Sequence, residues 1–101
     1  MRHRKHWELF LDLCLKTEKR ERLEELLNLF LTIEEKEHLA SRMQIINALL
    51  SKKLSQREIS DKMKVSIAQI TRGSNALKIV KNDLLNFIEN QIRKNQEHEQ
   101  S

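Results

Sequence analysis

The chain of 101 residues contains no proline and only one glycine, and this feature limits its fold more than any other. Folds built from strands and tight turns need glycine, proline or similar turn residues about every 8–12 positions. A sequence almost without such residues is typical of helices joined by short connections. We therefore expect an all-α fold.

Composition narrows the class of protein further. Apolar residues make up 39% and charged residues 34% of the chain, which is too apolar for a disordered protein and too charged for a membrane protein. The single cysteine, Cys14, excludes an internal disulfide and suits a reducing compartment. No apolar stretch is long enough for a membrane span or a signal peptide, so we expect a cytoplasmic protein of one domain.

Apolar residues at helical spacing predict six helices. Residues 1–6 form a basic arm that we expect to be flexible, residues 7–95 carry the helical pattern, and residues 96–101 form a polar tail. The segment from Leu23 to Leu31 is apolar on nearly every face, although a surface helix is apolar on one face only. We infer that a second copy of the chain covers part of this segment in an interlocked homodimer.

Capping signals mark three helix starts. Thr32 with Glu35 and Ser55 with Glu58 have the spacing of a capping box, in which each residue's side chain binds the other's backbone N–H. Ser66 is placed to cap a further helix. Two short helices joined by a tight turn are therefore predicted over residues 55–77.

This helix pair has the spacing of a helix-turn-helix. Lys64 occupies the turn position where glycine is usual, which costs modest strain. Apolar residues stand where the helices cross, and short polar residues face outward, where they can approach DNA bases. The crossing positions are Ile59, Met63, Val65 and Ile70, and the outward positions are Ala68, Gln69, Thr71 and Arg72. Spacing leaves a DNA-binding unit and a plain helical interaction domain open, and the net charge of +4 separates them only slightly.

The only glycine, Gly73, lies inside the second helix of this pair, where glycine costs about 1 kcal/mol relative to alanine. A helix end or close helix packing would explain it, and so would a ligand lying against the backbone. Arg72 beside it offers a planar fork for a carboxylate and a face for an aromatic ring, and Arg42 can supply a second guanidinium.

Two stretches of the sequence closely resemble the tryptophan repressor family. One is Gln56-Arg57-Glu58 followed by Ile70-Thr71-Arg72-Gly73-Ser74-Asn75-Ala76-Leu77-Lys78, and the other is Leu26-Leu27-Asn28-Leu29-Phe30-Leu31-Thr32. The resemblance extends without gaps from about Trp7 to Lys78. It implies an intertwined all-helical homodimer that binds L-tryptophan as corepressor. The loaded dimer of such a family blocks transcription of tryptophan biosynthesis genes at a palindromic operator on double-stranded DNA.

The resemblance also implies the residues of the tryptophan site, which chain segments of both subunits build in the family. Ala76 replaces a serine that faces the ligand ammonium, and this removes a polar contact worth about 1 kcal/mol. The implied site consists of the backbone carbonyls of Leu29 and Leu31 at the ammonium, Thr32 and Arg72 at the carboxylate, Arg42 and Arg72 on the two faces of the indole, Ile46 and Gly73 against the ring, and Ala76.

For DNA, the resemblance implies that Arg57 contacts a base and that Gln56 and Lys78 contact phosphates. The N-terminal part of the second helix supplies the remaining reading-head residues, which are Ile67, Ala68, Gln69 and Thr71. Gln69 replaces a threonine of the family, and Ser60 replaces a lysine. We expect the first departure to shift operator preference and the second to reduce the salt dependence of binding.

The residues do not favour an enzyme. No base–nucleophile pair is present, and the four histidines lack the carboxylate or cysteine neighbours of a metal site. We expect no catalytic residue, no metal and no cofactor other than L-tryptophan as corepressor. The alternative is a helix-turn-helix regulator that responds to a different small molecule or to none, which Ala76 keeps open.

Overall fold

The computed structural model describes residues 1–100, and this part of the chain is helical without strands. The helices are α1 (Arg4–Lys16), α2 (Arg20–Phe30), α3 (Ile33–Ser51), α4 (Gln56–Met63), α5 (Ile67–Lys78) and α6 (Asn82–Gln100). The prediction of an all-α fold with six helices is confirmed. The chain divides into two compact units, one of residues 1–37 and one from His38 onwards.

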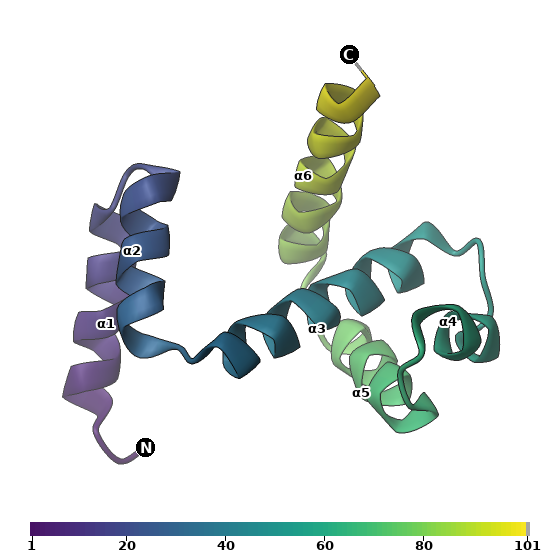
Figure 1. Cartoon of the computed structure of the whole chain (residues 1–101), viewed down its shortest axis with the longest axis horizontal. Coiled ribbons are helices and arrows are strands. Elements are labelled where there is room, and N and C mark those ends of the chain that lie inside the picture. Colours follow the sequence, from purple (N-terminus) through teal and green to yellow (C-terminus); the bar gives the residue numbers. More distant parts are fainter. Residues whose placement is uncertain (101) are drawn as a thin grey trace. The chain divides into compact units, whose positions relative to one another are not determined.

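In the first unit, α1 and α2 lie side by side (Figure 1). An aromatic cluster joins them: the ring of Phe10 meets that of Phe30 edge-on at 5.1 Å between centroids, and Trp7 stacks on Phe10 at 5.8 Å. The predicted capping box opens α3, because the Thr32 hydroxyl accepts from the Glu35 N–H at 3.0 Å and the Glu35 carboxylate accepts from the Thr32 N–H at 2.9 Å.

In the second unit, α4 and α5 pack together next to the C-terminal half of α3 (Figure 1). Three isoleucines, one from each of these helices, form the buried core: Ile45, Ile59 and Ile70. Half-buried apolar side chains surround them, and these are Ala48, Leu49, Leu54, Met63 and Val65. The core therefore lies at the helix-turn-helix and fixes α4 and α5 to α3.

Two helices extend beyond their predicted bounds. Helix α1 begins at Arg4, so only residues 1–3 of the expected arm precede it, and His3 there adopts a left-handed conformation. Helix α6 continues to Gln100 through residues of the expected polar tail, of which Ser101 lies outside the described residues. The tail has no apolar stripe to hold it in a helix. Its glutamine and glutamate residues are good helix formers, and an amide hydrogen bond between Gln91 and Asn95, at 2.9 Å, supports the extension of α6.

Candidate nucleic-acid interface and ligand cavity

Two complete capping boxes set where the helices of the helix-turn-helix begin. In α4, the Ser55 hydroxyl accepts from the Glu58 N–H and the Glu58 carboxylate accepts from the Ser55 N–H, both at 3.1 Å. In α5, Ser66 and Gln69 make the same pair of bonds at 3.2 and 3.4 Å. Donation from the backbone N–H of Ser55, and then from its hydroxyl, holds the pKa of Glu58 below its ordinary value.

Ser60 ties the turn between these helices to α4. Its hydroxyl donates to the carbonyl oxygen of Val65 at 2.6 Å, and the Val65 N–H donates to the carbonyl oxygen of Ser60 at 3.3 Å. Lys64, between them, adopts φ 56° and ψ 42°, the left-handed conformation predicted for the position where glycine is usual. The helix-turn-helix expected over residues 55–77 is confirmed, with its crossing residues at the core.

Replacing Lys64 with glycine is expected to stabilise the chain by about 1 kcal/mol. Glycine removes the strain of the left-handed conformation, and the larger conformational entropy that glycine loses on folding offsets only part of this gain. The midpoint of urea unfolding at fixed protein concentration measures the change. Lys62→Gly is the matched control, since Lys62 is exposed inside α4, where glycine should destabilise by about 1 kcal/mol. Equal destabilisation by both variants would contradict the strain at Lys64.

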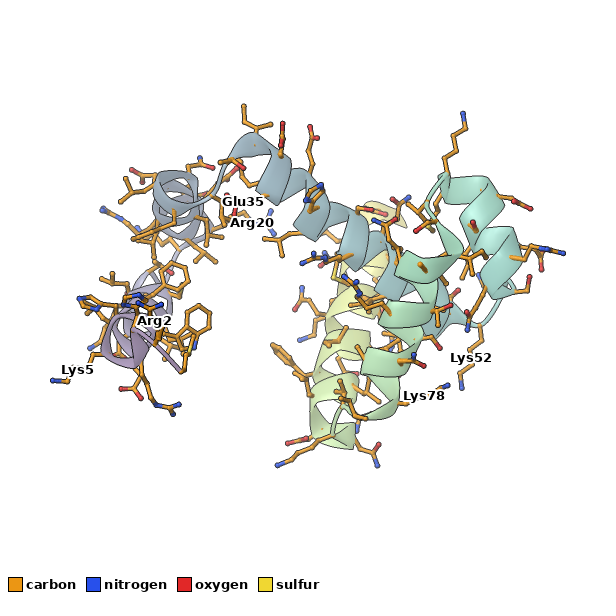
Figure 2. All side chains as sticks on the ribbon, turned by 90° about the horizontal axis from the view of Figure 1, so that it is seen from below. Arg2, Lys5, Arg20, Glu35, Lys52 and Lys78 are labelled. Carbon is orange, nitrogen blue, oxygen red and sulfur yellow. The ribbon has the colours of Figure 1, made fainter. Side chains whose placement is uncertain are left out.

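The expected DNA contacts lie exposed on this unit. Lys78 is on the last turn of α5 with its side chain extending outward (Figure 2). Gln56 reaches across to α5: its amide nitrogen donates to the Ser74 hydroxyl at 3.3 Å, and the Thr71 hydroxyl donates to its amide oxygen at 3.5 Å. Arg57 makes no hydrogen bond or ion pair with the described residues. The exposed set is Gln56, Arg57, Ile67, Ala68, Gln69, Thr71 and Lys78.

An open cavity of about 450 Å³ lies between α3 and α5, beside their contact. Each helix contributes one face, with residues spaced three and four positions apart. The lining consists of His38, Ser41, Arg42, Ile45 and Ile46 from α3 and of Gln69, Arg72, Gly73 and Ala76 from α5. Its volume is within the range of small-molecule sites, and its charged lining residues are basic.

Gly73 allows α5 to approach α3 closely beside this cavity. A Cβ atom at Gly73 would lie 3.3 Å from Cγ2 of Ile45 and 3.5 Å from Cδ1 of Leu49. Gly73 stands inside α5 with an ordinary helical backbone, so a helix end does not explain it. Close helix packing does, and the cavity wall begins at the same residue.

The structure brings together five of the eight residues that the family resemblance assigns to tryptophan, which are Arg42, Ile46, Arg72, Gly73 and Ala76. Leu29, Leu31 and Thr32 belong to the first unit. Sequence reasoning missed His38, Ser41 and Ile45 as lining residues and placed Gln69 on the DNA side only. Their spacing was the available signal, since the first three share a helix face with Arg42 and Gln69 shares one with Arg72 and Gly73.

The described residues contain no group of three or more histidine, cysteine, aspartate or glutamate side chains that could hold a metal ion. Over the same residues, no helix combines the length and apolar character needed to cross a membrane.

Comparison with known proteins identifies the family. The family model for the Trp repressor protein matches residues 5–92. A Trp operon repressor homolog of Chlamydia trachomatis serovar D is 50% identical over 86 residues, which cover 85% of this chain and 92% of that protein. A homolog of Chlamydia caviae is 50% identical over 88 residues (87% of each chain), and one of Histophilus somni is 40% identical over 98 residues (97% of this chain and 92% of that protein). The chain therefore belongs to the Trp repressor family of DNA-binding, helix-turn-helix transcriptional regulators.

Proposed function

We propose that this protein represses tryptophan biosynthesis genes in response to L-tryptophan, which binds between α3 and α5 as corepressor. One observation carries the proposal: Arg42 and Arg72 line a cavity of which one wall is α5, the helix that also carries most of the expected DNA contacts. A ligand in this cavity would touch α5, the recognition helix, from the side of α3. Its binding free energy would therefore act directly on the position of that helix.

The chemistry of the cavity suits an aromatic amino acid. Arg72 pairs with the carboxylate through its planar fork, while Arg42 and Arg72 stack on the indole faces, with Ile46 and Gly73 against the ring. Thr32 adds a hydroxyl to the carboxylate. The carbonyl oxygens of Leu29 and Leu31, at the C-terminal end of α2, accept from the ammonium, because the last carbonyls of a helix lack partners within it.

The protein acts as a homodimer in this proposal, and its exposed surface supports that. The single chain exposes 9164 Å², whereas a compact monomer of this mass exposes about 6000 Å² and two separately compact pieces about 7000 Å². Large apolar side chains are exposed on five of the six helices, among them Leu15, Leu29, Ile33, Ile67 and Phe87. A second copy would cover this surface and supply the α2 carbonyls to each cavity.

Sedimentation equilibrium is expected to give a mass of about 24 kDa, twice the chain mass of 12.1 kDa, at micromolar concentration. Burying the exposed apolar side chains provides the driving force, at about 25 cal/mol per Å². A mass near 12.1 kDa at that concentration would overturn the dimer.

On DNA, α5 enters the major groove, with Ile67, Ala68 and Thr71 at base edges. Arg57 reaches a base, and Gln56 and Lys78 hold phosphates. The family resemblance also assigns Gln69 to the DNA-contacting face of α5. The two heads of the dimer read the two halves of a palindrome, and tryptophan favours the arrangement in which both heads fit.

Selection of binding sites from a random DNA library, with and without L-tryptophan, tests the function. We expect a palindromic sequence to be enriched only with the ligand, and calorimetry to give one tryptophan per chain. A palindrome enriched equally without tryptophan, together with no heat of binding, would overturn the proposal.

Ala76 supports a second candidate, a helix-turn-helix repressor that answers a different small molecule or none. It lines the cavity with a methyl group, so this wall offers no hydroxyl to an ammonium. A panel of indoles and amino acids, including indole-3-propionate, separates the candidates by which compound induces DNA binding. Restoring serine in Ala76→Ser should strengthen tryptophan binding by about fivefold if the first candidate is correct.

A further inference from the structure

Gln69 belongs both to a helix cap and to the wall of the cavity. Its amide oxygen accepts from the Ser66 N–H at 3.4 Å, which completes the capping box at the start of α5. The same residue lines the cavity between α3 and α5, one helical turn from Arg72. Gln69 is thus a polar residue that belongs both to the ligand cavity and to the N-terminal cap of the recognition helix.

We propose that Gln69 is a ligand contact that couples the cavity to the reading head, and that it does not read a base. This inference rests on the proposed function and deepens it. The amide nitrogen of Gln69 donates to the anionic group of the ligand, while its amide oxygen keeps the cap on Ser66. The ligand thereby fixes the first turn of α5 through one side chain.

The hydrogen-bonding capacity of the amide supports this division of roles. A glutamine side chain has one acceptor oxygen and two N–H donors, and the oxygen is already used by Ser66. The amide nitrogen has no partner among the described residues, so both of its N–H donors are free for a ligand. The oxygen keeps a second lone pair, but the bond from Ser66 folds the side chain back onto the start of α5. Reading adenine in the two-bond manner of glutamine needs the whole amide turned toward the base edge, and that would move it away from the cap.

The charge of the cavity decides which part of the ligand Gln69 meets. Arg72 stands three residues after Gln69 on the same face of α5, and Arg42 and His38 face it from α3. No aspartate or glutamate is among the residues that line the cavity. A carboxylate is therefore the ligand group expected beside these donors, and an amide N–H adds a directed hydrogen bond to it.

Two substitutions separate the roles of Gln69. In Gln69→Glu the acceptor for Ser66 remains but the donor becomes a carboxylate oxygen, whereas Gln69→Leu removes both without adding charge. The measured quantity is the coupling ratio, the DNA affinity with saturating L-tryptophan divided by the affinity without it, from fluorescence polarisation on the selected palindrome. Calorimetry gives the tryptophan affinity, and helical circular dichroism confirms that each variant is folded.

Both variants are expected to lower the coupling ratio by about tenfold, and Gln69→Glu to weaken tryptophan binding by about as much. Gln56→Leu is the comparison on the DNA face: it should lower DNA affinity with and without tryptophan equally, so its coupling ratio stays that of the wild type. A wild-type ratio in both Gln69 variants, or a changed base preference with that ratio intact, would overturn the inference. Absence of coupling in the wild type would instead overturn the proposed function.

Discussion

Replacing Arg72 with leucine is expected to abolish the response to L-tryptophan and to leave the fold intact. The side chain is exposed and makes no hydrogen bond or ion pair with the described residues, so its loss leaves no buried partner unpaired. In the proposed site, however, Arg72 binds the carboxylate and covers one face of the ring. A hydrogen-bonded partner of a charge contributes about 1.5–3 kcal/mol, so tryptophan affinity should fall by about 100-fold.

Two control variants show which property of Arg72 matters. Arg72→Lys keeps the charge but loses the planar fork, and it should bind tryptophan with intermediate affinity. Arg57→Leu removes a cation from the proposed DNA face of α4, and it should bind tryptophan like the wild type while losing operator DNA. If Arg72→Leu retained the tryptophan response of the wild type, the ligand would not occupy the cavity between α3 and α5.

The starts of α3, α4 and α5 could be predicted because capping is a local interaction. A serine or threonine and a glutamate three residues later satisfy each other's backbone N–H wherever the helix goes, and the boxes at Thr32 and Ser55 are found as expected. Helix α1 carries no such signal. His3 precedes it in a left-handed conformation without a side-chain cap, so the sequence could not place its first residue.

The cavity was predictable only in part, for a different physical reason. The family motif identifies Arg72, Gly73 and Ala76, but whether a polar residue on the same face points to the ligand or to DNA depends on how two helices cross. Gln69 illustrates this, since it lies in the turn of α5 that both surfaces share. The close contact of Gly73 with Ile45 sets that crossing, and it joins residues far apart in the sequence.

Replacing Ile59 with alanine is expected to give the largest loss of stability, about 3–4 kcal/mol. Ile59 is completely buried, and it is one of three isoleucines that hold α3, α4 and α5 together. Deleting most of its side chain removes contacts with all of them and leaves a cavity that a core this small cannot close by shifting. Since small domains are stable by only about 5–15 kcal/mol, a large share of the stability would be lost.

Urea unfolding at fixed protein concentration measures the loss of stability, and Ile59→Val is the control with a smaller deletion. Valine removes a single methyl group at the same place, so it should cost about 0.5–1.5 kcal/mol. Tryptophan at one hundred times its dissociation constant should stabilise Ile59→Ala by about 2.7 kcal/mol, because the proposed site exists only in the folded chain. DNA binding by this variant would then recover with the ligand, unlike binding by Arg72→Leu, which separates loss of the fold from loss of the site. A change below about 1 kcal/mol in Ile59→Ala would mean that the helix-turn-helix does not depend on this core.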